Sequence, residues 1–158
     1  MTTREFAWDD LDELYREVIL DHYRSPRNRR AVPEPHVAAE GINPFCGDEV
    51  TVHLRLDGND TITEVGFQGQ GCSISQASTS MMTEVLQGKS LQQSRALIAA
   101  FKELMHGKEL SDEELERLGN LEALQGVRKF PIRIKCALLG WATLEDGLDQ
   151  YEARAEKG

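Results

Sequence analysis

The sequence predicts an α+β fold in which helices pack on a small antiparallel sheet of about three strands. Residues 49–56 alternate apolar and polar side chains, which is the period of a half-buried strand. The turn-forming sequence at residues 57–60 separates this run from further strand-like residues at 62–67, as expected for an antiparallel hairpin. Apolar residues elsewhere recur at helical spacing. At 158 residues the chain suits one domain that spans residues 1–158.

The N-terminal part is predicted to be a helix followed by a loop. Asp9 or Asp10 can cap this helix, which should end before Pro26. His22 lies in its last turn, where the helix dipole favours a cation, so we interpret it as a terminus or packing residue rather than a metal ligand. Residues 27–40 contain prolines and little periodicity, which predicts a loop that leads to a short extended piece near residues 37–39.

A glycine-rich stretch marks the passage from the last strand to the second helix. Glycine allows the sharp backbone turn that this passage needs, and Ser73 or Ser75 can act as the N-cap. Cys72 therefore lies beside a helix N-terminus, where exposed N–H groups stabilise a thiolate. The helix is expected to end near Gly88.

Two capping boxes predict the helices that follow. Ser90 with Gln93 opens one helix, and Ser111 with Glu114 opens one or two short helices in an acidic stretch. Pro131 is at a suitable first position for a last helix.

The last helix is expected to carry both core residues and a thiol. Ile132, Leu139 and Trp141 are predicted to contribute to the core, and Cys136 lies one turn into the helix. Residues 145–155 are expected to extend it as a polar, fraying end.

The composition excludes several classes of protein. A formal net charge of −9 disfavours binding to nucleic acid or to an anionic membrane surface, and the basic run at residues 24–30 is too short for a nucleic-acid groove. We interpret that run as a solvated or partner-facing loop. Residues 1–8 contain no apolar signal core, and no window approaches the ~18 apolar residues of a membrane span. Three cysteines without a secretion signal argue against a disulfide framework, so we expect a cytoplasmic protein.

Cys46, Asp48, Cys72 and Cys136 are the only plausible metal-ligand set in the sequence. They can offer three thiolates and one carboxylate to a tetrahedral cation such as Zn²⁺. Gly47 can adopt a positive φ, so that the side chains on either side of it converge. Spacing alone leaves an alternative open, because no Cys-x-x-Cys pair is present: the cysteines are often buried free thiols in such chains, and Asp48 is a common turn residue.

Three cysteine motifs closely resemble those of the IscU/NifU-like proteins of iron-sulfur cluster assembly. They are Asn-Pro-Phe-Cys-Gly-Asp at residues 43–48, Gly-Gln-Gly-Cys-Ser-Ile-Ser-Gln-Ala-Ser at residues 69–78, and Arg-Ile-Lys-Cys at residues 133–136. Residues 15–28 resemble the N-terminal helix signature of the same family. The resemblance runs from about residue 15 to residue 148 and implies an IscU/SufE-like fold.

Two departures from the IscU pattern point to one branch of this family. Lys135 stands just before the third cysteine, where the IscU scaffolds have a histidine. The acidic stretch at about residues 107–125 resembles the helical insertion that marks the SufU group. Together these features make the chain resemble SufU.

That resemblance implies a Zn²⁺ site made by Cys46, Asp48, Cys72 and Cys136. It further implies a sulfurtransferase that accepts persulfide sulfur from a cysteine desulfurase of the SufS type, with Cys46 as the acceptor and little activity expected alone. Downstream iron-sulfur scaffold proteins are further expected partners.

Two other functions remain open at this level. The first is a scaffold that assembles a transient Fe-S cluster, with iron on the same ligands. Thiolates are suitable ligands for such a cluster, but Lys135 in place of the histidine weakens this hypothesis. The second is a structural zinc-binding adaptor, in which the metal only stabilises the fold.

Overall fold

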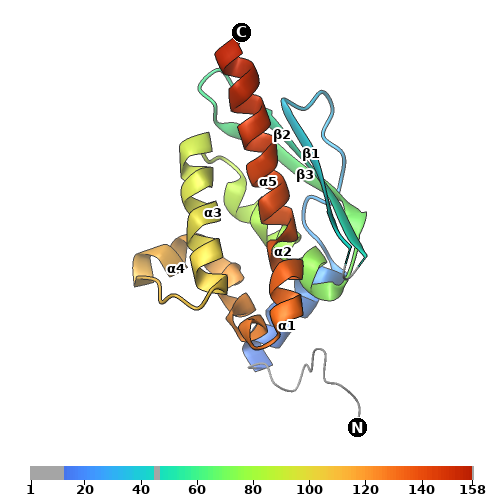
Figure 1. Cartoon of the computed structure of the whole chain (residues 1–158), viewed down its shortest axis with the longest axis vertical. Coiled ribbons are helices and arrows are strands. Elements are labelled where there is room, and N and C mark those ends of the chain that lie inside the picture. The colour runs from blue at the N-terminus through green and yellow to red at the C-terminus, as the bar shows by residue number, and fades with distance from the viewer. Residues whose placement is uncertain (1–12, 45–46, 158) are drawn as a thin grey trace.

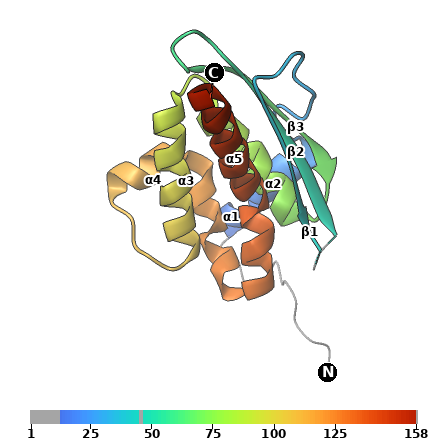
Figure 2. The same ribbon diagram turned by 45° about the horizontal axis from the view of Figure 1, so that its top comes forward.

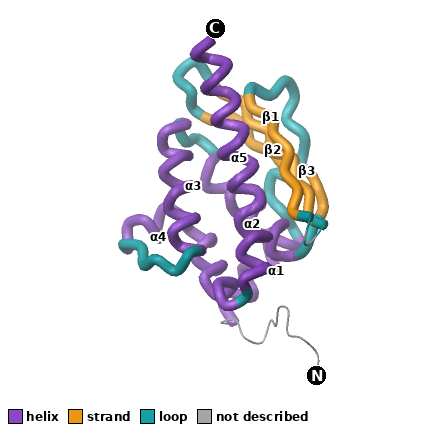
Figure 3. The backbone as a smooth tube through the Cα atoms, viewed as in Figure 1, coloured by secondary structure: helices purple, strands orange, loops and turns teal. Residues whose placement is uncertain are grey.

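The computed structural model describes residues 13–44 and 47–157 and contains a three-stranded antiparallel sheet with the order β1-β2-β3 (Figure 1). The strands are β1 (Val37–Asn43), β2 (Asp48–Leu56) and β3 (Ile62–Gln70). Helices lie on one side of this sheet, which Figure 3 shows as a group of orange strands beside purple helices. The predicted α+β class and the number of strands are confirmed.

β1 is longer than the expected piece at residues 37–39. Its seven residues pair with β2 in an unbroken antiparallel register from Val37 opposite Leu54 to Asn43 opposite Asp48. Backbone hydrogen bonds to β2 extend this strand, and no clear alternation in its sequence signals the extension. The register places Asn43 and Asp48 side by side at the end of the hairpin.

The helices are α1 (Glu13–Arg24), α2 (Ser73–Leu86), α3 (Leu91–Met105), α4 (Asp112–Leu118) and α5 (Pro131–Lys157), with a 3₁₀ helix η2 (Gly119–Lys129) before α5. Both predicted capping boxes are present, at the starts of α3 and α4. Figure 2 shows α5 and α2 next to the sheet, with α3 and α4 further from it. None of the helices among the described residues is long and apolar enough to cross a membrane.

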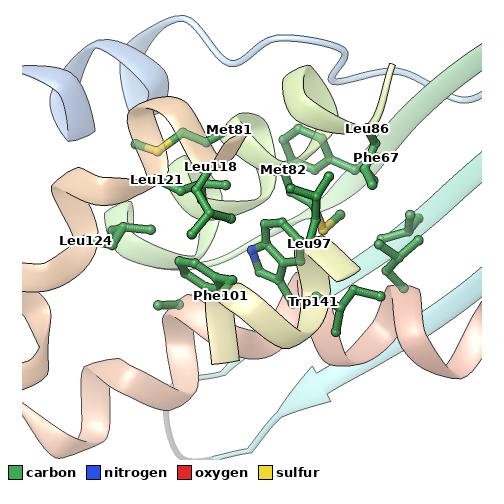
Figure 4. Packing of buried hydrophobic residues seen from close by; sticks show 14 of the residues in the cluster. Phe67, Met81, Met82, Leu86, Leu97, Phe101, Leu118, Leu121, Leu124 and Trp141 are labelled. Carbon is green, nitrogen blue, oxygen red and sulfur yellow. The ribbon is translucent and has the colours of Figure 1, made fainter. Parts of the chain in front are cut away.

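The core lies between the sheet and the helices, and large side chains from distant elements meet there (Figure 4). Phe101 of α3 stacks on Trp141 of α5 with ring centroids 4.9 Å apart. Trp141 is therefore a core residue as predicted. Ile132 is not, because 61% of it is exposed. It lies in the first turn of α5, before the part of this helix that packs into the core.

α5 also differs from the prediction at its C-terminal end. Residues 145–155 are helical, but Leu148 is fully buried, so this extension belongs to the core instead of being only a polar, fraying end. Close packing holds the middle of the helix. A Cβ atom at Gly140 would lie 2.5 Å from Thr79 Oγ1 of α2, so only glycine permits this approach. The position of Cys136 on α5 is thereby fixed relative to α2.

The loop after α1 is attached to buried hydroxyl groups of α2. His22 Nδ1 lies 2.8 Å from Ser80 Oγ, and the Arg27 amide donates to the same oxygen at 2.8 Å. The Asn28 side-chain amide donates to Thr83 Oγ1 at 3.0 Å. The interpretation of His22 as a packing residue is supported. The middle of the basic run is therefore in contact with α2 and is more than a solvated loop.

Candidate metal centre

Three of the four predicted ligands meet at one end of the molecule. One ligand atom from each of Asp48, Cys72 and Cys136 lies within 4.8 Å of the other two. They come from the start of β2, the residue before α2 and the second turn of α5, so only the folded chain brings them together (Figure 1). Cys46 lies outside the described residues. Its neighbour Gly47 has a φ of 70°, the positive value that the sequence predicted.

Asp48 is a fully buried carboxylate. Its Oδ1 accepts a hydrogen bond from the Cys72 amide at 2.8 Å, and its Oδ2 lies 4.0 Å from Cys72 Sγ. A Cβ atom at Gly71 would lie 2.5 Å from Asp48 Oδ1, so glycine is needed for this close approach. Both contacts are with Cys72, and neither the amide nor the thiol carries a positive charge. A buried carboxylate is costly without a compensating cation, so this placement favours a metal ligand over a turn residue.

Cys72 is itself the N-cap of α2, where the sequence predicted Ser73 or Ser75. Its Sγ accepts a hydrogen bond from the Ser75 amide at 3.5 Å. A hydrogen bond with Cys136 is the main cause that lowers the pKa of the Cys72 thiol to about 6. Backbone amides of Ser75 and Ile74 lower this pKa further, while burial and the charge of Asp48 raise it. Cys72 is thus prepared to act as a thiolate.

Cys136 is fully buried and is surrounded by hydrogen-bonding groups. Asn43 Nδ2 lies 3.7 Å from its Sγ, and Arg133 Nη1 lies 4.0 Å from it. The Ile132 carbonyl is the acceptor for its S–H at 3.7 Å. Two nitrogen donors and a carbonyl group therefore hold the Cys136 sulfur in place next to Asp48 and Cys72.

The donor set fits a zinc ion. Zn²⁺ in proteins is bound by thiolate sulfur, imidazole nitrogen and carboxylate oxygen, usually four of them in a tetrahedron. Asp48, Cys72 and Cys136 supply two sulfur atoms and one oxygen, and their combined negative charge calls for a cation. Cys46, two residues before Asp48 in the sequence, is the predicted fourth ligand. This assignment stays a prediction.

Sequence reasoning missed two contributors to this centre. Asn43 was part of a motif but had no assigned role, and the structure gives it a contact with Cys136. The hairpin register could have found it, because Asn43 pairs with Asp48. Gly71 was assigned only a turn, whereas it also makes room for the Asp48 carboxylate.

Comparisons with known proteins identify the family of this chain. The family model described as the NifU-like N terminal domain matches residues 14–137. The zinc-dependent sulfurtransferase SufU of Bacillus subtilis (strain 168) is 46% identical over 143 residues, which cover 90% of this chain and 95% of that protein. The iron-sulfur cluster assembly scaffold protein IscU of Streptococcus pyogenes serotype M1 is 38% identical over 142 residues, covering 90% and 87%.

A solved structure has the same fold. The crystal structure of SufU from the thermophile Fervidobacterium islandicum AW-1, which is named as an iron-sulfur cluster assembly scaffold protein for the SUF system, has a TM-score of 0.80 and 36% identity. The match covers 90% of this chain and 99% of that one. The chain therefore belongs to the IscU/NifU-like family of iron-sulfur cluster assembly proteins and is a SufU-type member of it.

Proposed function

We propose that this chain is a zinc-dependent sulfurtransferase of iron-sulfur cluster assembly that accepts persulfide sulfur from a SufS-type cysteine desulfurase. The observation that carries the proposal is the convergence of Asp48, Cys72 and Cys136 within 4.8 Å of one another, in a chain that is 46% identical to a zinc-dependent SufU. Cys46 is the fourth proposed ligand. We also infer a cytoplasmic location, because a site built on free thiols suits a reducing compartment.

The proposed roles divide between holding the metal and accepting sulfur. Asp48, Cys72 and Cys136 are placed by three different elements, so they are suited to hold the ion throughout. Cys46 lies next to Gly47, whose positive φ turns the chain between the two ends of a hairpin, and it is the proposed acceptor. Zinc, when bound, supplies a positive charge that keeps the surrounding thiols in their nucleophilic thiolate form.

The proposed transfer is a thiol-disulfide type exchange. The Cys46 thiolate attacks the outer sulfur of the persulfide on the partner's cysteine. A new S–S bond forms on Cys46, the S–S bond of the partner breaks, and the partner's cysteine leaves as a thiolate that takes up a proton. One persulfide is exchanged for another, so no external oxidant or reductant is consumed.

A scaffold function is the second candidate, because the IscU relative and the Fervidobacterium protein are named as scaffolds. The same thiolates and carboxylate can hold iron. Lys135 argues against it, since this position offers an ammonium group that cannot act as a ligand while protonated. A structural zinc adaptor is the third candidate.

The test combines metal analysis with desulfurase assays on the same sample. The expected result is one zinc per chain, a large stimulation of cysteine turnover by a purified SufS-type desulfurase, and a persulfide on Cys46. Cys46→Ala should abolish persulfide formation, while Asp48→Ala should mainly lose zinc. Iron and sulfide in anaerobically purified protein, with little stimulation, would support the scaffold. Unchanged sulfur transfer in Cys46→Ala would support the adaptor.

A further inference from the structure

The end of η2 and the start of α5 together carry a cluster of positive charge close to the metal centre. Arg128, Lys129, Arg133 and Lys135 lie within eight consecutive positions. All 27 acidic residues lie outside residues 123–144, although the net charge of the chain is −9. Lys129 and Lys135 are exposed, and Arg128 and Arg133 are partly exposed. This segment therefore presents a cationic surface on an acidic protein.

An exposed apolar side chain lies in the middle of these cations. Ile132 is 61% exposed, and its carbonyl group accepts the hydrogen bond of Cys136. Ile42 at the end of β1 is 68% exposed and precedes Asn43, which also contacts Cys136. Two of the four large exposed hydrophobic residues in the described part of the chain thus adjoin residues that touch the metal centre. Exposure of a large apolar side chain beside a functional site is typical of an interaction surface.

We propose that residues 128–135, here called the α5 surface, are the docking site for the cysteine desulfurase, and that the desulfurase presents carboxylates around an apolar contact for Ile132. This inference rests on the proposed function, because sulfur transfer requires the two reacting sulfur atoms to approach to bonding distance. The partner must then cover the end of the molecule where Cys136 lies. Protein–protein interfaces commonly have an apolar centre and a polar, charged rim. Opposite charges on the two proteins raise the rate of association.

The charge part of the proposal is tested with two matched lysine variants. Lys129→Glu reverses an exposed charge on the α5 surface. Lys108→Glu makes the same change between α3 and α4, where the lysine side chain is 71% exposed. Binding to a purified SufS-type desulfurase is measured at low salt and at high salt. Lys129→Glu should raise the dissociation constant by about 10-fold at low salt and by less at high salt. Lys108→Glu should change it by less than about 2-fold.

The apolar part is tested with Ile132→Ser and a matched loss of exposed apolar surface, Tyr23→Ser on α1. Tyr23 is 45% exposed. Ile132→Ser should weaken binding by about 10-fold with little dependence on salt, because its contribution is burial of apolar surface. Tyr23→Ser should bind like the unchanged protein. Zinc content and the melting temperature of each variant confirm that the fold and the metal centre are intact.

Binding is measured without cysteine, so that the desulfurase carries no persulfide and no sulfur can move. Equal effects of Lys129→Glu and Lys108→Glu, together with normal binding by Ile132→Ser, would overturn the docking site. If the unchanged protein still stimulated turnover in a parallel assay with cysteine, the sulfurtransferase function would stand. Selective loss of binding in the α5 variants supports the docking site even if Cys46 accepts no sulfur.

Discussion

The two ends of α2 both bury polar groups, but they do so in different ways. Near the C-terminal end, the Ser80 and Thr83 hydroxyls bond to the loop that follows α1. At the N-terminal end, Cys72 and Asp48 contact each other and Cys136, so groups that carry or can acquire negative charge are gathered together. The Ser80 and Thr83 hydroxyls find their partners within the protein, whereas the second cluster gathers groups whose negative charge calls for a cation. The difference separates a structural polar network from a functional one.

Removal of zinc should produce the largest effect and tests whether the N-terminal cluster depends on a cation. Without the ion, clustered thiolates and a buried carboxylate repel one another, and the link between β2, α2 and α5 is lost. We expect a loss of several kcal/mol in the free energy of unfolding, roughly 10 °C or more in melting temperature. The measurement is a melting curve before and after chelation, with metal content verified. An unchanged curve after verified removal would contradict the proposed zinc centre.

The N-terminal cluster could largely be predicted from the sequence, whereas the hydroxyl contacts of Ser80 and Thr83 could not. The thiols and Asp48 were found because their chemistry is rare and their motifs are specific. Asn43 and the N-cap role of Cys72 were missed, since both depend on register and side-chain direction in the folded chain. Ile132 was assigned to the core from its spacing, which cannot tell where a helix first meets its neighbours. The assignment of residues 107–125 as an insertion stays a prediction.

Changes at Asn28 test the C-terminal cluster and should affect stability without affecting zinc. Asn28 has a φ of 60° and donates to Thr83. Asn28→Gly tolerates this backbone and should lose about 1 kcal/mol through the hydrogen bond. Asn28→Ala should lose about 2 kcal/mol, because a positive φ strains alanine as well. Denaturant unfolding measures both values. Loss of zinc from either variant, measured while that variant is fully folded, would show that the two clusters are coupled.

Asn43→Ala should lower the affinity for zinc while the fold is retained. This is the reverse of the pattern expected for the Asn28 variants, which lose stability but keep zinc. Asn43 donates to the Cys136 sulfur, and partners that hold a ligand in place typically contribute about 10-fold or more to metal affinity. Competition with a chromophoric zinc chelator measures the change. Glu40→Ala, an exposed residue on the same strand, is the matched control. Equal zinc affinity in both variants would leave Asn43 with only a structural role.

His22 gives the smallest expected effect and tests whether the C-terminal cluster excludes charge. Burial lowers the pKa of His22, and the charge of Arg27 lowers it further, whereas Glu84 and Asp21 raise it. Its Nε2 lies 3.3 Å from Glu84 Oε1 without forming a hydrogen bond among the described residues. The folded chain therefore holds this imidazole in its neutral form, rather than as the cation that its helix position favours.

The sign of the pH dependence follows from this lowered pKa. Above pH ~6.5 the imidazole is neutral in both states, and below it the unfolded chain binds the proton more readily. The free energy of unfolding should fall as the pH drops from ~6.5 through the folded pKa, by at most about 1.4 kcal/mol per pH unit from this group.

His22→Asn keeps a hydrogen-bonding group near Ser80 and should reduce that slope, whereas His106→Asn, at an exposed histidine, should not. Denaturant unfolding between about pH 5.5 and 7.5, one unit on each side of the ordinary histidine pKa, measures the slopes. Equal slopes for both variants would mean that the cluster around Ser80 accommodates the imidazolium, and burial alone would then not distinguish the two ends of α2.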